Sequence, residues 1–213
     1  MSVPRLIAWG AVAMILTHWL RILPLGLHAP GSVRYEDFVD LLTPFVVLGP
    51  ALTVLARRSV GRGAWAAALL GSAMFVQGHG LHLSANSISY ASGFDPPAYL
   101  WDEVVGHHLW FAGLTIVVVV VAEAVRTSPM PIRPPACVLA CLVGITWGVN
   151  VVEGGTVPFG ASLATGLAVY GWRTRGEGTG SLLVLAFGVS LVLVAAYGVW
   201  QGGYPQPSQL GWL

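Results

Sequence analysis

Long runs of apolar residues constrain this chain more than any other feature. Residues 117–121 are five consecutive valines, and residues 181–200 contain no charged side chain. A helix that crosses the hydrocarbon core of a bilayer needs about 20 mainly apolar residues. Only 9% of the residues are charged, whereas soluble domains carry about 25%, so the charges are too few to cover a water-exposed surface. The sequence therefore predicts an all-α integral membrane protein.

Seven segments have this character, and each is bounded by proline, glycine, arginine or polar residues, as expected where helices leave a bilayer. They are roughly Arg5–Leu23, Tyr35–Leu55, Gly63–Ser84, Tyr99–Val121, Pro135–Val152, Val157–Trp172 and Gly180–Gln201. We expect the first to be a helix and not a signal peptide, because no small-x-small cleavage site follows Leu25. No linker divides the chain, which predicts a single seven-helix transmembrane domain over residues 1–213.

Arginine placement predicts the orientation of these helices. All ten basic residues are arginine, and seven spans place eight of them on the side of the N-terminus. These eight are Arg5, Arg57, Arg58, Arg62, Arg126, Arg133, Arg173 and Arg175, and the other side has Arg21 and Arg34. Basic residues concentrate in cytoplasmic loops. The pattern thus predicts a cytoplasmic N-terminus and an external C-terminus in a plasma membrane of the bacterial type.

Histidines and acids gather toward the opposite side. All six histidines and seven of the nine acids fall there, the exceptions being Glu123 and Glu177. Ionisable groups within a membrane span are costly and usually functional. Because several helices contribute them at one depth, we expect a shared cavity that opens to the outside.

Helical spacing brings some of these groups onto common faces. His79 and His82 are three residues apart, and Glu103 and His107 are four apart, so each pair shares a face of its helix. At about 100° per residue, His108 points elsewhere and Asp102 lies about 100° from Glu103.

Neutral imidazole is a common metal ligand, and three protein ligands with one open position are typical of catalytic zinc. We therefore predict a divalent-metal site made by His79, His82 and His107 with one carboxylate, first of all Glu103. Zinc is the first choice, and iron or copper accept the same ligands. A single haem held by His82 and His107 is an alternative cofactor.

We expect the remaining polar residues to transfer protons, orient ligands or bind substrate next to that ion. Glu103 either binds the metal or acts as general base toward a metal-bound water whose pKa the ion lowers toward neutrality. Glu153 is the second candidate for the base. Asn150, Tyr197 and Gln201 would orient ligands or hydrogen-bond the substrate.

Structural interpretations of the same residues stay open. His79 and His82 would brace the bundle by hydrogen bonds to Glu103 or Asn150, without a metal. His18 and Arg21 would form an ion pair with Asp40 or Glu36, since an unpaired buried charge is expensive. Other expected structural roles are packing for His108, Cys137 and Cys141, a loop position for His28, and a helix cap or first-turn acid for Asp102.

Several function classes can be excluded or ranked. A retinal Schiff base needs lysine, and the chain has none; no basic tract is present that would bind nucleic acid. Transport is disfavoured because the inner halves of the spans are nearly free of polar groups, whereas transporter sites lie near the midplane. The preferred function is a metal-dependent hydrolase that acts on a lipid-like or amphiphilic substrate from the membrane.

Two other functions remain as alternatives. One is an iron, copper or haem oxidoreductase at the same residues. The other is a non-catalytic integral subunit that contacts a protein partner. The C-terminal tail, residues 202–213, would lie across that partner or, in the enzyme, form a lid over the cavity. In outline the pattern resembles the seven-helix membrane hydrolases that include alkaline ceramidases. Those enzymes have a late H-x-x-x-H motif, whereas the seventh segment here contains no histidine.

Overall fold

The computed structural model describes residues 1–19, 35–93, 95–128, 130 and 132–212, without the side chains of residues 35, 36 and 90–92. Within these residues the secondary structure is entirely helical, and no strand is present. The all-α prediction is therefore confirmed for the described part of the chain. The predictions for Arg21, His28 and Arg34, and for the Glu36 side chain, lie outside it.

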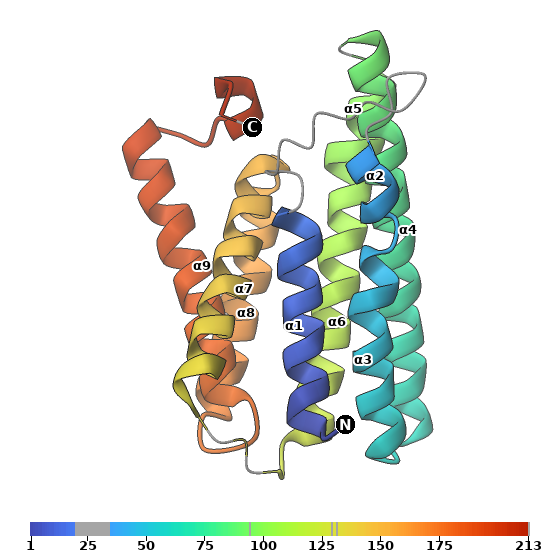
Figure 1. Cartoon of the computed structure of the whole chain (residues 1–213). Helices are drawn as coiled ribbons and strands as arrows, with labels where there is room; N and C mark the ends of the chain where they lie inside the picture. Colours follow the sequence, from blue (N-terminus) through green and yellow to red (C-terminus); the bar gives the residue numbers. More distant parts are fainter. Residues whose placement is uncertain (20–34, 94, 129, 131, 213) are drawn as a thin grey trace.

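The described residues form seven long helical segments (Figure 1). They are α1 (Val3–Trp19); α2 (Tyr35–Asp40) followed by α3 (Thr43–Arg57); α4 (Arg62–Ser92); α5 (Pro96–Tyr99), η3 (Leu100–Gly106) and α6 (His107–Val125) in succession; α7 (Pro134–Glu153); α8 (Val157–Arg173); and α9 (Gly180–Gln201). A short 3₁₀ turn, η4 (Pro207–Leu210), follows in the C-terminal segment.

Successive long helices alternate in direction, so the two chain termini lie at opposite ends of the bundle (Figure 1). Helix α4 packs along α6, α1 packs along α3, and α9 packs along both α7 and α8. The eight arginines expected on the side of the N-terminus all lie at or near helix ends on that side. We call this the arginine end and the opposite one the histidine end.

Four helical segments in the described residues are long and apolar enough to cross a membrane, which is consistent with a membrane protein. They are Asp37–Arg57, Pro96–Val125, Pro134–Glu153 and Gly180–Gln201. Helices α1 and α8 have 17 residues each, which corresponds to about 26 Å at 1.5 Å per residue. Helix α4 has 31 residues and is less apolar because it carries Gln77, His79, His82 and Asn86.

The outer surface of the bundle supports the same conclusion. Large apolar side chains point outward on several helices; Val199 is 86% exposed and Val192 is 69% exposed. Inside, Trp110, Phe111, Trp147 and Phe187 form a chain of edge-to-face ring contacts. The Trp147 indole N–H donates to the Gly160 carbonyl at 3.2 Å, so the largest buried side chain also satisfies its polar atom.

Two of the predicted segments are longer in the structure. Helix α4 continues to Ser92, eight residues beyond the predicted end at Ser84, and stops before Gly93, whose φ is +81°. The fourth segment begins at Pro96 and runs to Val125. Polar residues were interpreted as the ends of these helices, but the helical structure continues through them. In α4, for example, Ser87 Oγ donates to the Leu83 carbonyl of the same helix at 2.9 Å.

Candidate metal centre

The entrance to α6 is a π-helical segment, and this local structure shapes the site. Asp95 caps α5 by accepting a hydrogen bond from the Ala98 N–H at 2.9 Å. In η3, which follows, the His107 backbone N–H donates to the Asp102 carbonyl five residues earlier. The His107 Nδ1–H donates to the same carbonyl at 3.0 Å. The wider turn therefore brings Asp102 next to His107; π-helical turns occur frequently at functional sites.

Glycines let α4 approach this segment closely. A Cβ on Gly78 would lie 2.5 Å from the Trp110 nitrogen and 2.6 Å from the Gly106 oxygen. A Cβ on Gly106 would lie 2.8 Å from the Trp101 carbonyl oxygen and 3.1 Å from the His82 backbone nitrogen. The distances below 3.0 Å are too short for a Cβ next to backbone atoms, so a side chain at Gly78 or Gly106 would push the segments apart. As a result His82, one turn after Gly78, reaches the start of α6.

His82, Asp102 and His107 form a compact cluster. The His82 Nδ1 donates to Asp102 Oδ1 at 2.5 Å, and His107 Nδ1 lies 3.8 Å from the same oxygen. The two imidazole rings are in contact, with centroids 4.6 Å apart. One donor atom from each residue lies within 4.8 Å of the others, and Asp102 and His107 are buried. This donor set is suitable for a divalent metal ion.

Glu103 adjoins the cluster on the same turn of helix. Its Oε2 lies 3.2 Å from His107 Nδ1, as the four-residue spacing predicts. Its Oε1 accepts a hydrogen bond from Gln206 Nε2 at 3.0 Å. The other ring nitrogen of His107, Nε2, faces Gly154, where a Cβ would lie only 2.8 Å away. The site thus joins η3, α4, α6 and the end of α7.

His79 does not join the three-residue cluster. Its Nε2 donates to the Asp40 carbonyl at 2.8 Å and lies 3.4 Å from Asp40 Oδ1. Thr43 donates to the same Asp40 carboxylate at 2.6 Å. Although the His79 and His82 rings have centroids 6.3 Å apart, His79 belongs to a separate buried pair between α2 and α4.

The other predicted site residues lie around the cluster and not within it. Asn150 accepts a hydrogen bond from His18 and donates to the Thr146 carbonyl at 2.7 Å. Glu153 accepts a hydrogen bond from the Ser208 N–H at 3.1 Å.

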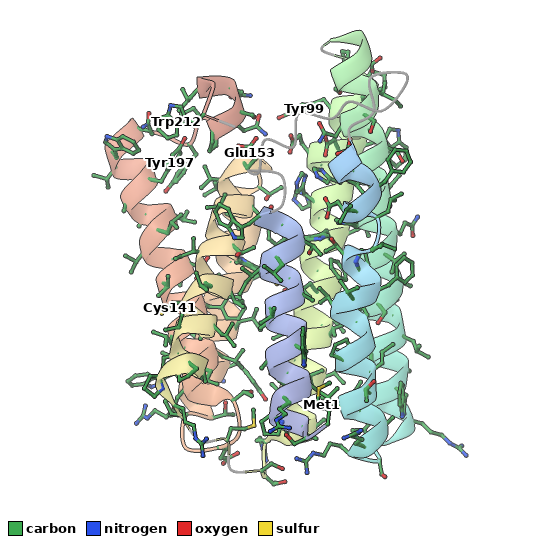
Figure 2. The ribbon with its side chains drawn as sticks, in the orientation of Figure 1. Met1, Tyr99, Cys141, Glu153, Tyr197 and Trp212 are labelled. Carbon is green, nitrogen blue, oxygen red and sulfur yellow. The ribbon has the colours of Figure 1, made fainter. Side chains whose placement is uncertain are left out.

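Tyr197 donates to the Pro205 carbonyl at 2.7 Å. It lies beside Trp212 on the α9 side of the bundle, whereas Glu153 is at the end of α7 (Figure 2). Gln201 is the last residue of α9. Outside the metal-ligand set, the His108 ring contacts Phe159 at 4.4 Å between centroids, and Cys137 and Cys141 are free thiols.

Two residues of the centre were not predicted from the sequence. Asp102 was placed about 100° from Glu103 on an α-helical count, but the π-helical turn brings Asp102 next to His107, five residues later. Gln206 lies in the C-terminal tail, which the sequence suggested either as a lid over the cavity or as a partner contact, but no pattern singled out this residue. Comparison with family models, curated proteins and solved structures gives no match to this chain.

Proposed function

We propose that this protein is a membrane-embedded, metal-dependent enzyme in which His82, Asp102 and His107 hold a divalent ion. The observation that supports it is the convergence of three metal-ligating donors from two packed helical segments within 4.8 Å. Ionisable groups in apolar helices are expensive to bury, so a cluster of this kind is more consistent with a ligand site than with packing.

Hydrolysis is the first reaction that we propose, with zinc as the ion. Two histidines and one carboxylate leave an open coordination position, as in catalytic zinc sites. The ion would supply Lewis-acid chemistry and activate water. Glu103 is suited to accept and return the proton, because its carboxylate touches His107 and is close to the donor set without being one of the three ligands.

The proposed substrate and orientation are supported by the position of the centre along the bundle. Asp102, Glu103 and His107 are near the beginning of the apolar segment Pro96–Val125, at the end of the bundle remote from the arginines. We propose that all seven helices cross the membrane, with the arginine end in the cytoplasm and the centre facing outside a plasma membrane. A lipid-like or amphiphilic substrate would reach this boundary from the bilayer.

A non-haem iron oxidoreductase is the second candidate, because two histidines and one carboxylate are also the ligands of many iron(II) oxygenases. Haem is less consistent with the geometry. The imidazoles of His82 and His107 touch each other, which leaves no space for a macrocycle between them.

Elemental analysis of the detergent-purified protein, with an absorption spectrum, tests the proposal first. We expect close to one zinc per chain in the wild type and His108→Ala, and loss of most of it in His82→Ala and His107→Ala. Iron with a visible spectrum would move the reaction to oxidation. No bound metal, in protein that accepts none on titration, would overturn the proposal and favour the integral-subunit alternative, with a partner chain to be sought by co-purification.

Activity is the second test. The zinc-loaded protein should hydrolyse fluorogenic ester or amide lipids that are presented in vesicles. At a zinc concentration that saturates the variant, Glu103→Gln should lose turnover by roughly 10²–10⁴-fold, the usual contribution of a positioned acid or base. If Glu103→Gln has the same turnover as the wild type, Glu103 does not transfer the proton.

A further inference from the structure

The C-terminal segment 202–212 folds back across the histidine end, and we call it the strap. Gly202 follows α9 in the left-handed conformation, with φ of +66°, which turns the chain. Tyr197 of α9 then donates to the Pro205 carbonyl. At the far end of the strap, Trp212 stacks on Trp200 with ring centroids 5.2 Å apart. Two contacts with α9 therefore hold the strap in place.

Gln206 and Pro207 are buried at the centre of the strap, and Gln206 has 7% of its surface exposed. Its side-chain amide is oriented from within the strap, because Gln209 Nε2 donates to Gln206 Oε1 at 2.5 Å. With its oxygen occupied in this way, the amide nitrogen is directed out of the strap. It donates to Glu103 Oε1 at 3.0 Å and to the Glu153 carbonyl at 2.6 Å.

A donor is required at this position. Both atoms that face Gln206 Nε2 are oxygens that accept hydrogen bonds, and one belongs to a carboxylate. Glutamate has the same shape as glutamine but would present only acceptors when ionised. The contact is therefore specific for an amide, and it uses both of the Nε2 hydrogens.

Glu103 is therefore hydrogen-bonded by the strap and lies against His107. One carboxylate oxygen accepts a hydrogen bond from Gln206, and the other lies 3.2 Å from His107 Nδ1, whose hydrogen is directed to the Asp102 carbonyl. Hydrogen-bonded partners of a metal-binding histidine fix its ring orientation, and their own partners fix them in turn. In this structure Gln206 contacts Glu103, and Glu103 in turn contacts His107.

We infer that Gln206 is a positioning residue for Glu103: the strap delivers one amide N–H that holds this carboxylate against His107 at the metal centre. The inference rests on the proposed function for its effect on metal binding. The Gln206–Glu103 contact itself does not require the ion and can be tested separately.

Zinc affinity of the full-length protein, measured by competition with a chromophoric chelator, is the first test. Gln206→Leu and Gln206→Glu should each weaken zinc binding by about 10–100-fold, the usual effect of losing such a partner. Ser208→Ala is the matched control in the strap, because it retains the main-chain N–H that binds Glu153, and its affinity should equal that of the wild type. Unchanged affinity in Gln206→Leu would overturn the inference and leave the proposed function standing.

Opening of the strap is the second test, and it needs no metal. Chymotrypsin cleavage after Leu210, followed by mass spectrometry of the intact protein, should be roughly tenfold or more faster in Gln206→Glu, because a hydrogen bond to a charged group is lost. The double variant Glu103→Gln, Gln206→Glu should be cleaved more slowly than Gln206→Glu alone. In it the amide at position 103 can donate to the carboxylate at position 206, the reverse of the wild-type hydrogen bond.

Equal cleavage rates in the wild type and Gln206→Glu, or no slowing by Glu103→Gln, would overturn the inference. A wild type that binds no zinc would overturn the proposed function, and the cleavage comparison would then decide on Gln206 alone.

Discussion

The two ends of the helical bundle use ionisable residues in opposite ways. At the arginine end, Arg126 lies 3.1 Å from Glu177 and 3.6 Å from Glu123, and these side chains are about half exposed, between 46% and 53%. At the histidine end, the side chains of Asp40 and His79 are 4% and 3% exposed, and their atoms are 3.4 Å apart. Similar distances between paired groups thus occur in a solvent-exposed and in a buried environment.

Burial changes what such a pair does. Exposed ion pairs contribute about 0.2–1 kcal/mol because water and salt screen them. Removal of one partner from a buried pair leaves an uncompensated polar group and costs about 3–5 kcal/mol. The comparison indicates that ion pairs at the arginine end contribute little to packing, whereas the buried pair at the histidine end links neighbouring helices.

The largest effect is expected from breaking the Asp40–His79 pair. Asp40→Ala should lower the free energy of unfolding by about 3–5 kcal/mol, measured by reversible unfolding in mixed micelles. Replacing both residues with leucine should recover part of that loss, because neither ionisable partner is then left alone, although the Thr43 hydroxyl still loses its acceptor. Loss of less than about 1 kcal/mol in Asp40→Ala would mean that this pair behaves like an exposed one.

Stabilisation of the protein by zinc should depend on Asp102 and not on Asp40. At a zinc concentration 100 times the dissociation constant, ligand binding raises the free energy of unfolding by about 2.7 kcal/mol. We expect this increase in Asp40→Asn, whose carboxylate is outside the cluster, and its absence in Asp102→Asn at the same zinc concentration. The reverse result would place the ion at His79 and Asp40.

Close packing of α4 on α6 is the next effect in size. Gly78→Ala should cost about 1–3 kcal/mol of unfolding free energy, as overpacked contacts do, and should lower zinc content because it separates His82 from α6. Gly80→Ala is the control on the same helix, since a Cβ there meets nothing within 4 Å. Equal stability of the two variants would contradict the close contact.

The smallest effect is expected at the arginine end. Glu177→Gln should change the free energy of unfolding by less than about 1 kcal/mol, and the difference should shrink further at high salt, which screens exposed charges. A larger loss of unfolding free energy that does not change with salt would show that this pair is shielded from solvent like Asp40 and His79.

Much of the fold was predictable because it depends on repeated local signals. Apolar length predicted the seven helical segments, and α7, α8 and α9 begin and end within about one residue of their predicted limits, which is closer than helix ends are usually defined. The four-residue spacing of Glu103 and His107 also predicted their contact correctly. These inferences need only the geometry of a regular helix.

The composition of the centre was less predictable, because its members depend on departures from regular structure. His79 and His82 look equivalent on a helical wheel, yet each meets a different aspartate from a different neighbouring helix. Asp102 reaches His107 through a π-helical turn that no residue pattern announces. Gln206 enters through a chain reversal after α9.

The sequence by itself therefore determined the class of structure, the limits of α7, α8 and α9, and the segregation of arginine from histidine along the bundle. These properties follow from hydrophobicity and from the period of the α-helix. Only the tertiary structure decided that His82, Asp102 and His107 converge while His79 pairs with Asp40, and that the strap contacts Glu103. Such contacts depend on how closely helices approach and how a turn is wound, and these are set by packing between residues far apart in the chain.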